Sequence, residues 1–211
     1  MKKATITKKI NDIGAFAVVR VDEYERAMEI AQACIDGGIP AMELSYTSNN
    51  AGAYIKRLRE DFGNNLCLGA GTVLDPETAR DAILNGAEFI IAPTFSKEVA
   101  KMCNRYQIPY GPGCSTYSEA VEALEYGAAF IKAFPISDFY GSKLVKVFKT
   151  PFPDMPILAS GGINLDNIGE WVENGVDVCG IGSLLTKGSK SQIEKNAKEL
   201  RIAIDKVRGN L

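Results

Sequence analysis

The segment Gly38-Ile39-Pro40-Ala41-Met42-Glu43 decides the fold, because its pattern recurs three more times along the chain. In each copy a glycine ends a helical stretch, a small or aliphatic residue follows, and a short apolar strand begins. The other copies begin at Gly86, Gly127 and Gly175, so successive copies are 48, 41 and 48 residues apart. Each interval has room for two strand–helix units, and such a period indicates a repeated supersecondary unit. The copies are therefore predicted to be the even-numbered strands of an eight-stranded fold.

Eight short apolar segments fit this scheme, and most are apolar on both faces, as in a parallel sheet that helices cover. Between them, apolar residues recur at the i, i+3, i+4 spacing of amphipathic helices. Asp75, Pro76 and Glu77 mark the start of one helix with an N-cap, a proline and an early acid. The predicted strands are residues 15–20, 41–44, 66–70, 89–92, 109–111, 129–133, 157–159 and 178–181, and the predicted helical stripes are 27–38, 51–62, 99–106, 168–175 and 193–207.

The odd-numbered strands end differently, at Gly69-Ala70-Gly71-Thr72, at residues 111–115 and at Ser160-Gly161-Gly162. Eight units with this two-fold alternation predict an α/β fold, a (β/α)8 TIM barrel whose inner layers come from alternate strands. The alternative is a doubly wound open sheet, which usually has a G-x-G-x-x-G turn after its first strand; residues 17–22 contain none. No linker or charge block divides the chain, so residues 1–211 are predicted to form one TIM-barrel domain.

The composition excludes several classes of function. The 211 residues include 24 Lys and Arg and 26 Asp and Glu, and this balance argues against nucleic acid or an anionic membrane as a partner. Histidine is absent, which excludes Ser-His-Asp and Cys-His catalysis and every metal site that depends on imidazole. Acid–base chemistry must therefore fall to Glu, Asp, Lys, Tyr, Cys or water.

The five cysteines indicate a reducing compartment. Their number is odd and no C-x-x-C pair occurs, so buried reduced thiols in a cytosolic protein are the simplest interpretation. The first nine residues carry charge but lack the apolar region of a signal peptide. No apolar run approaches the length of about 18 residues that a membrane span needs. We therefore expect a cytoplasmic protein without a membrane segment.

Three charged residues stand at the carboxyl ends of predicted strands, where barrel active sites lie: Arg20, Glu43 and Lys132. Glu43 and Lys132 each fall five residues after a repeat glycine, so both side chains have the same height and face. If that face is the lumen, they converge on one pocket. Alternatively, each is only the first solvated residue after its strand, but two ionisable groups at equivalent apolar positions favour the pocket.

Lys132 is a candidate nucleophile because its neighbours Phe130, Ile131, Ala133 and Phe134 are apolar. Desolvation lowers the pKa of an ammonium group, and a neutral lysine can form an imine with a carbonyl substrate. The alternative, a lysine that reaches out of the barrel, is disfavoured by the proline that follows.

Glu43 is the candidate proton carrier, since imine chemistry moves protons to and from carbon and oxygen and no histidine is present. The charge of Lys132 would lower the pKa of Glu43, whereas burial would raise it, and the sequence does not fix the sign.

Two glycine-containing segments, residues 160–163 and 180–183, follow the predicted seventh and eighth strands. Such loops expose backbone N–H groups, and a helix that begins at Ser183 would direct its positive end to the same point. This is where TIM barrels bind phosphate, so an anion site is predicted. The alternative is a pair of tight turns whose glycines need positive φ.

The motifs together resemble those of the 2-keto-3-deoxy-6-phosphogluconate aldolases, some of which act as 4-hydroxy-2-oxoglutarate aldolases. The similarity spans about residues 8 to 205. The Schiff-base signature of that family matches Phe130-Ile131-Lys132-Ala133-Phe134-Pro135, and its glutamate motif matches residues 37–45. Its G-A-G-T-V segment matches residues 69–73, and its x-P-x loop matches residues 92–94.

The resemblance implies a class I aldolase that cleaves a 2-keto-3-deoxy-6-phospho sugar acid or 4-hydroxy-2-oxoglutarate to pyruvate and an aldehyde, glyceraldehyde 3-phosphate or glyoxylate. Lys132 would form the imine, and Glu43 would move protons through a bound water. The family is commonly trimeric and needs no metal or other cofactor, so a homotrimer that binds a small, phosphorylated keto acid is expected. The implied substrate-binding residues are Arg20, Thr72 for the pyruvate carboxylate, Pro93, Phe134, and, for the distal phosphate, Ser160, Gly161, Gly162, Gly182 and Ser183.

One departure from the family pattern affects the substrate. Where many members read E-V-T-L-R-T, this chain reads Glu43-Leu44-Ser45-Tyr46-Thr47-Ser48, so Thr47 replaces an arginine that would bind a carboxylate. The sequence leaves open whether the substrate carries a phosphate and whether it derives from gluconate or galactonate. Two other functions are considered: a phosphate-binding TIM-barrel epimerase or synthase, as in thiamine phosphate synthase, and a non-catalytic sugar-acid-phosphate binder. The pair of Glu43 and Lys132 favours the aldolase.

Overall fold

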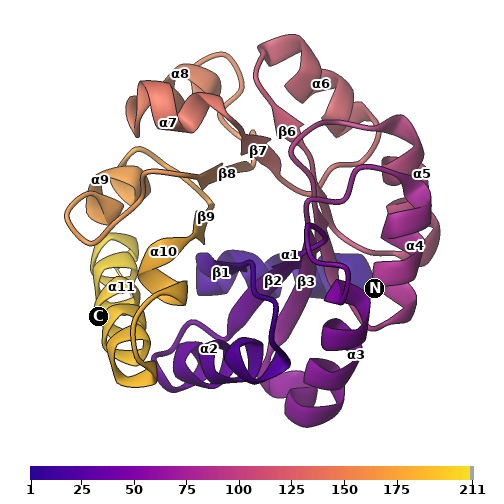
Figure 1. Cartoon of the computed structure of the whole chain (residues 1–211). Helices are drawn as coiled ribbons and strands as arrows, with labels where there is room; N and C mark the ends of the chain where they lie inside the picture. The colour runs from indigo at the N-terminus through magenta and orange to yellow at the C-terminus, as the bar shows by residue number, and fades with distance from the viewer. Residues whose placement is uncertain (210–211) are drawn as a thin grey trace.

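Within residues 1–209, which the computed structural model describes, nine short parallel strands form one sheet that curls into a barrel surrounded by helices (Figure 1). Residues 210 and 211 of the predicted domain lie outside the described residues. The strands are β1 (Ala15–Val19), β2 (Ala41–Ser45), β3 (Cys67–Gly71), β4 (Phe89–Ile91), β5 (Tyr110–Gly111), β6 (Gly113–Cys114), β7 (Ile131–Ala133), β8 (Ile157–Ser160) and β9 (Val178–Ile181).

The barrel closes at an interrupted strand. The order of the sheet is β5-β4-β3-β2-β1-β9-β8-β7-β6, so its two end strands, β5 and β6, are consecutive in the chain and separated only by Pro112. Proline has no N–H for the ladder, but its carbonyl accepts a hydrogen bond of 2.9 Å from the N–H of Lys132. The predicted fifth strand is therefore split in two. The (β/α)8 TIM barrel is confirmed, and an open doubly wound sheet is excluded.

The helices lie outside the barrel in the order that strand–helix units require (Figure 1). Asp75 caps one of them as predicted, since its carboxylate accepts a hydrogen bond of 2.6 Å from the N–H of Thr78. The helices after the strands are α2 (Tyr24–Asp36), α3 (Ala51–Phe62), the short 3₁₀ turn η1 (Gly63–Asn65), α4 (Pro76–Leu84), α5 (Lys97–Tyr106), α6 (Tyr117–Glu125), α7 (Ile136–Tyr140), α8 (Lys143–Lys149), α9 (Ile168–Glu173), α10 (Ser183–Thr186) and α11 (Lys190–Arg208).

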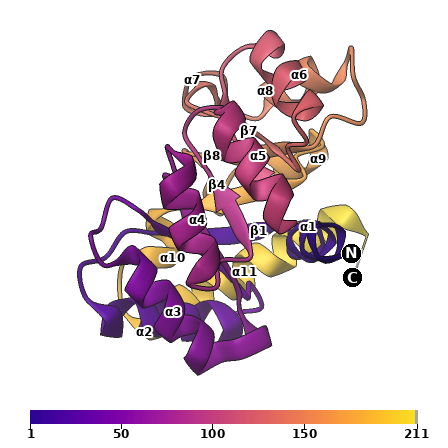
Figure 2. The same ribbon diagram turned by 90° about the vertical axis from the view of Figure 1, so that its right-hand side faces the viewer.

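A further helix, α1 (Lys2–Ile13), precedes the barrel and was not predicted. Its buried residues Ile6 and Ile10 belong to the same apolar cluster as Phe16, Phe130 and Leu158, which come from three strands or strand edges of the lumen. Figure 2 shows α1 at the end of the molecule where both chain termini lie. The helix therefore closes the amino end of the barrel.

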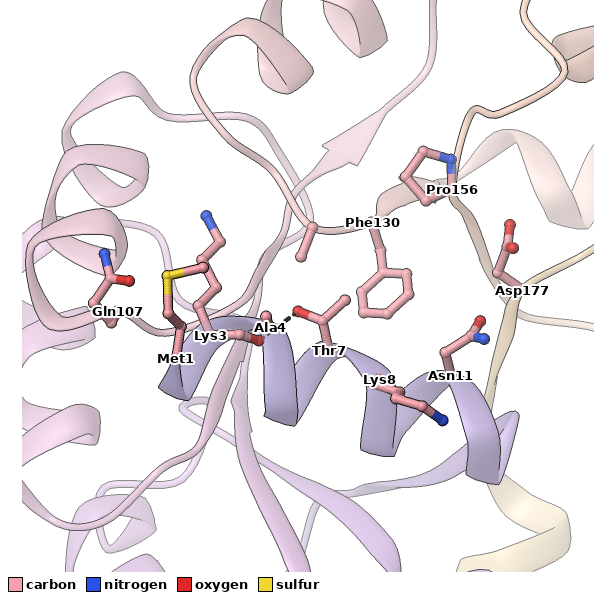
Figure 3. Close-up of a pocket in the computed structure, with 11 residues that line it drawn as sticks. Met1, Lys3, Ala4, Thr7, Lys8, Asn11, Gln107, Phe130, Pro156 and Asp177 are labelled. Carbon is pink, nitrogen blue, oxygen red and sulfur yellow. Dashed lines mark hydrogen bonds between the residues drawn. The ribbon is translucent and has the colours of Figure 1, made fainter.

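Beside α1 lies a hollow of about 590 Å³. Its walls include Thr7 of the helix, Phe130 and Pro156, and these side chains face one another across it in Figure 3. This hollow is at the amino ends of the strands, so it is separate from the carboxyl ends where the predicted site residues stand.

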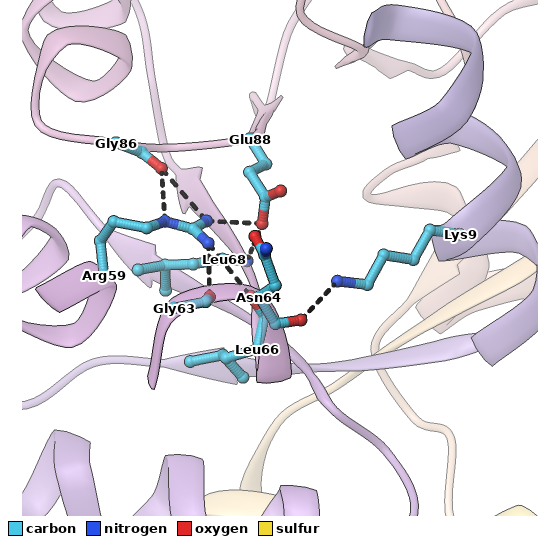
Figure 4. A network of polar contacts seen from close by, with 8 residues as sticks. All are labelled: Lys9, Arg59, Gly63, Asn64, Leu66, Leu68, Gly86 and Glu88. Atoms are coloured by element: carbon cyan, nitrogen blue, oxygen red, sulfur yellow. Dashed lines mark hydrogen bonds and ion pairs between the residues drawn. The ribbon is translucent and has the colours of Figure 1, made fainter. Parts of the chain in front are cut away.

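An arginine fixes the amino ends of β3 and β4. Arg59 of α3 donates hydrogen bonds to the carbonyl oxygens of Gly63 and Gly86 and forms an ion pair with Glu88 (Figure 4). The same Glu88 carboxylate accepts a hydrogen bond of 3.2 Å from the N–H of Leu68. Both charged side chains are partly buried. Their hydrogen bonds join α3, its following turn and two strands.

The interior agrees with the predicted reduced thiols. The five cysteines are buried and free, and burial raises the pKa of each thiol, so these side chains act as small apolar residues in the packing. Among the helices of residues 1–209, none is both long and apolar enough to cross a membrane.

Candidate active site

A cavity of about 670 Å³ opens at the carboxyl ends of the strands. Every predicted site residue lines it except Glu43, which lies buried beside it. Segments far apart in the sequence thus meet at one mouth of the barrel. The lining residues are Val18, Arg20, Thr47, Thr72, Pro93, Lys132, Phe134, Asp138, Ser160, Gly161, Gly162, Ile163, Asn164, Gly180, Gly182 and Ser183.

Lys132 lies in the middle of β7, between Gly113 of β6 and Leu158 of β8. Its side chain is only 8% exposed, and Nζ lies 4.8 Å from the centre of the Phe134 ring. Burial lowers the pKa of this amine, as the sequence predicts; the charge of Arg20 lowers it further, and Glu43 opposes the shift. The surroundings therefore make the neutral, nucleophilic form easier to reach than in a free lysine.

Glu43 lies in the middle of β2 and is 2% exposed. Burial raises the pKa of its carboxyl group, and the nearby charges of Lys132 and Arg20 act in the opposite direction. Burial is the largest of these causes, which settles the sign that the sequence left open. Among residues 1–209, no group forms a hydrogen bond with Oε2, so one carboxyl oxygen is free to accept or donate a proton.

Gly71 makes room for this carboxyl group. A methyl group at Gly71 would lie 2.6 Å from Oε1 of Glu43, closer than atoms can pack. The same alternation of large and small residues occurs one layer deeper, where a methyl group at Gly69 would lie 2.3 Å from the ring of Phe89. The glycines of β3 therefore shape the space in which Glu43 is held.

Three hydroxyl groups form a cluster after β2 and β3. The buried Ser45 Oγ lies 2.8 Å from Thr72 Oγ1 and accepts a hydrogen bond of 3.1 Å from Thr47 Oγ1. Thr72 has a φ of 59°, a left-handed conformation that is rare for a β-branched residue and that the cluster holds in place. Ser45 was not predicted as a site residue, although it lies two residues after Glu43 and thus on the same face of β2.

Arg20 follows β1 at the rim of the cavity and is exposed. It is close enough to influence the pKa of both Glu43 and Lys132. Because Thr47 stands where the family pattern has an arginine, Arg20 and Lys132 are the two basic residues in the lining as described for residues 1–209. Both lie at the catalytic end of the cavity.

The two glycine segments form the other end of the cavity. Gly161 and Gly162 have φ of 106° and 65°, values that only glycine adopts readily, and Asn167 Nδ2 donates a hydrogen bond of 2.9 Å to the carbonyl of Gly162. The helix expected to begin at Ser183 is α10, which has only four residues. The helix therefore begins where the sequence predicts, and its first-turn N–H groups lie beside the glycine segments.

Asp138 of α7 also enters the cavity, although it was not predicted as a site residue. A methyl group at Gly161 would lie 2.2 Å from its Oδ1, so the carboxylate lies directly against the glycine turn. The signal was present: Asp138 stands shortly after Pro135, which ends the lysine strand at its carboxyl edge. Helix α7 was not predicted, and the residue was therefore not placed.

Comparisons with known proteins show the family to which this fold belongs. The family model described as KDPG and KHG aldolase matches residues 6–202. The chain is 33% identical over 184 residues to 2-dehydro-3-deoxy-6-phosphogalactonate aldolase of Escherichia coli K12, covering 87% of this chain and 89% of that protein. It is 33% identical over 168 residues to 2-dehydro-3-deoxy-phosphogluconate aldolase of Treponema pallidum, 80% of each chain. A solved structure described as "Native KDPGal structure" has a TM-score of 0.87 and 29% identity, covering 92% of this chain and 96% of that one. The chain belongs to the KDPG and KHG aldolase family.

Proposed function

We propose that this protein is a class I aldolase that cleaves a 4-hydroxy-2-oxo acid into pyruvate and an aldehyde, with Lys132 as the imine-forming residue. One observation carries the proposal: a buried lysine and a buried glutamate meet beside one cavity, and burial shifts the pKa of each toward its neutral form. A neutral amine can attack a ketone, and a protonated carboxyl group can donate a proton.

The reaction begins when the neutral Lys132 amine adds to the C2 ketone and forms a carbinolamine. Loss of water yields the protonated imine, which accepts the electron pair when the C3–C4 bond breaks. The C4 hydroxyl loses its proton as the aldehyde forms, and the three-carbon fragment remains as an enamine. Protonation at C3 and addition of water then release pyruvate and restore the amine.

Glu43 is proposed to move these protons. Its free Oε2 and its nearly complete burial suit a group that alternates between acid and base within one turnover. Because the cavity surface does not include Glu43, a bound water would connect its carboxyl group to the substrate oxygen. Proton transfer by a positioned side chain contributes about 10²–10⁴-fold to a rate.

The substrate carboxylate is proposed to lie between Arg20 and Thr72. Arg20 supplies the charge that Thr47 cannot, and the hydroxyl cluster of Ser45, Thr47 and Thr72 supplies donors of fixed geometry. Pro93 and Phe134 form the apolar walls beside the reacting carbon atoms.

The far end of the substrate is proposed to lie against Ser160, Gly161, Gly162, Gly182 and Ser183. The names of the two relatives above refer to phosphorylated sugar acids. A phosphate or a hydroxyl group at the end of the substrate would reach the same two loops, where main-chain N–H groups are available.

The protein is proposed to be a homotrimer. Three large apolar side chains are exposed on neighbouring helices, Phe139 at 77%, Tyr140 at 68% and Val147 at 67%. Helices α7 and α8, which carry them, lie side by side on the outside of the barrel (Figure 1). Large exposed apolar side chains on adjacent helices favour a site of protein association.

Borohydride reduction in the presence of pyruvate tests the proposed chemistry. Only an imine is reduced to a stable secondary amine, so mass spectrometry of the digested protein should find a pyruvate-derived adduct on Lys132. The matched control is Lys132→Met, which should remain unmodified. An unmodified wild-type protein that also releases no pyruvate from any 4-hydroxy-2-oxo acid would exclude the aldolase in favour of a silent binder or another TIM-barrel enzyme.

A further inference from the structure

In the part of the chain that the structure describes, the far end of the cavity lining carries a negative charge and no positive one. Asp138 lines the cavity there, and its carboxylate lies against the turn of Gly161 and Gly162. Within residues 1–209, the basic residues that line the cavity are Arg20 and Lys132, both at the catalytic end. A phosphate at these loops would therefore meet main-chain N–H groups and a carboxylate, without a lysine or arginine in this part of the lining as described for residues 1–209.

We infer that Asp138 is a specificity-determining residue that disfavours a phosphate dianion and favours a hydroxyl group at the far end of the substrate. The inference rests on the aldolase function proposed above and names its substrate class: unphosphorylated 4-hydroxy-2-oxo sugar acids. The 6-phosphorylated acids expected from the sequence then become the poorer substrates.

Simple electrostatics supports both halves of the inference. A carboxylate and a phosphate dianion that face each other across a few ångströms repel, and like charges placed together strongly disfavour a partner. A terminal hydroxyl group, in contrast, can donate a hydrogen bond to the carboxylate, and hydrogen bonds to an ionised acceptor are the stronger kind. The Asp138 side chain thus disfavours the phosphorylated substrate and favours the unphosphorylated one.

Among residues 1–209, Asp138 forms no ion pair with a lysine or arginine, although Lys143 lies near it. A second hollow beside α7 shares Asp138, Gly161 and Gly162 with the cavity, and its lining also includes Lys143 and Glu170. Among residues 1–209, Asp138 and Lys143 form no ion pair within the 4 Å that defines one, and the acidic Glu170 lies in the same hollow. The carboxylate is exposed and remains available to the substrate side of the turn.

The experiment compares a 2-keto-3-deoxy hexonic acid with and without its 6-phosphate, a pair that differs only at the far end. Pyruvate release gives kcat/KM for each acid with wild-type protein, with Asp138→Asn and with Glu170→Gln. We expect wild-type protein to favour the unphosphorylated acid. In Asp138→Asn, kcat/KM for the phosphorylated acid should rise relative to the other by about tenfold, the effect of 1.4 kcal/mol. Glu170→Gln removes a charge that does not line the cavity, so it should change the ratio much less than Asp138→Asn does.

The dependence on salt distinguishes repulsion from a change of shape. Repulsion from an exposed carboxylate is screened over about 8 Å at 0.15 M salt, so the wild-type ratio of phosphorylated to unphosphorylated kcat/KM should rise with salt. In Asp138→Asn that rise should disappear. A wild-type protein that strongly favours the phosphorylated acid, with a ratio unchanged in Asp138→Asn, would overturn the inference and leave the aldolase function intact. Absence of pyruvate from both acids would instead reject the proposed function.

Discussion

Lys132 and Glu43 show how one barrel prepares two opposite groups for chemistry without histidine. Burial is the largest cause in both cases, and it lowers the pKa of the amine while it raises the pKa of the carboxyl group. Each charge moderates the shift of the other, so the two groups are tuned as a pair. The free energy for these shifts comes from the packing of the surrounding barrel.

Replacing Lys132 by methionine should abolish pyruvate release and increase stability. Methionine is flexible and fills a similar apolar volume, and the variant removes a buried amine that costs about 1.4 kcal/mol for each unit by which its pKa is lowered. The folded pKa lies below the ordinary value of 10.5, so the gain should be largest at neutral pH and should vanish as the pH reaches 10.5. Urea unfolding from pH 7 to 10.5 measures it, and an equal gain at both ends of that range would contradict the assignment.

Glu43→Gln should lower kcat by about 10²–10⁴-fold and change KM much less, because the lost function is proton transfer. Stability supplies a second measure. The folded pKa is raised above 4.5, so below pH 4.5 the carboxyl group is protonated in both the folded and the unfolded state. The stability gain of Glu43→Gln over wild type should therefore be absent at pH 4 and should grow as the pH rises through the raised pKa. A gain that does not depend on pH would show that Glu43 titrates normally.

At the residue scale, repetition made the central pair predictable. The equal spacing of Glu43 and Lys132 from their glycines places both in the lumen, where the structure has them. The balance of opposing effects on Glu43 could not be predicted, since it depends on how completely the carboxyl group is buried. Asp138 was missed for a related reason: its position depends on a short helix whose sequence has no clear periodicity.

At the element scale, the glycines of β3 leave the space that the Glu43 side chain of β2 occupies. Gly71→Ala should displace the Glu43 carboxyl group, because the added methyl would lie 2.6 Å from Oε1. We expect a folded protein whose kcat falls at least about tenfold, since a small misplacement of a reacting group is costly.

A matched glycine variant provides the control for Gly71→Ala. Gly169 lies in α9, and among residues 1–209 no atom beyond its chain neighbours and its own helix backbone lies within 4 Å of where its methyl group would be. Gly169→Ala should keep full activity and gain about 0.5–1 kcal/mol, because alanine is the better helix former. Circular dichroism melting and the pyruvate assay measure both variants, and wild-type kcat in Gly71→Ala would show that the close contact is relieved by movement elsewhere.

The elements themselves were predictable where periodicity was strong. All eight predicted strands correspond to strands of the barrel, because buried parallel strands read as short apolar runs. The break at Pro112 follows from the missing N–H of proline. Helix α1 escaped prediction because few of its residues are buried, Ile6 and Ile10 among them, and two contacts give little periodicity.

At the scale of the whole molecule, the exposed apolar residues of α7 and α8 predict the assembly. Val147→Lys should convert the proposed trimer into a monomer, because a charge would be buried at the interface without a partner. Ile202→Lys is the matched control, since Ile202 is 57% exposed on the distant helix α11 and should leave the assembly intact. Light scattering after gel filtration distinguishes the two, and a monomeric wild-type protein would reject the trimer.

Because α1 closes the amino end of the barrel, the cavity opens only at the carboxyl ends of the strands in the part of the chain described. Lys132 is buried at the inner end of the cavity, whereas Gly162 and Ser183 at its mouth are exposed. After the proposed cleavage, the aldehyde therefore lies between the mouth of the cavity and the three-carbon fragment that is bound to Lys132. The aldehyde must depart first and pyruvate last, and in the synthetic direction pyruvate must arrive first. In the proposed mechanism, the covalent bond to Lys132 and the packed amino end of the barrel together set this order.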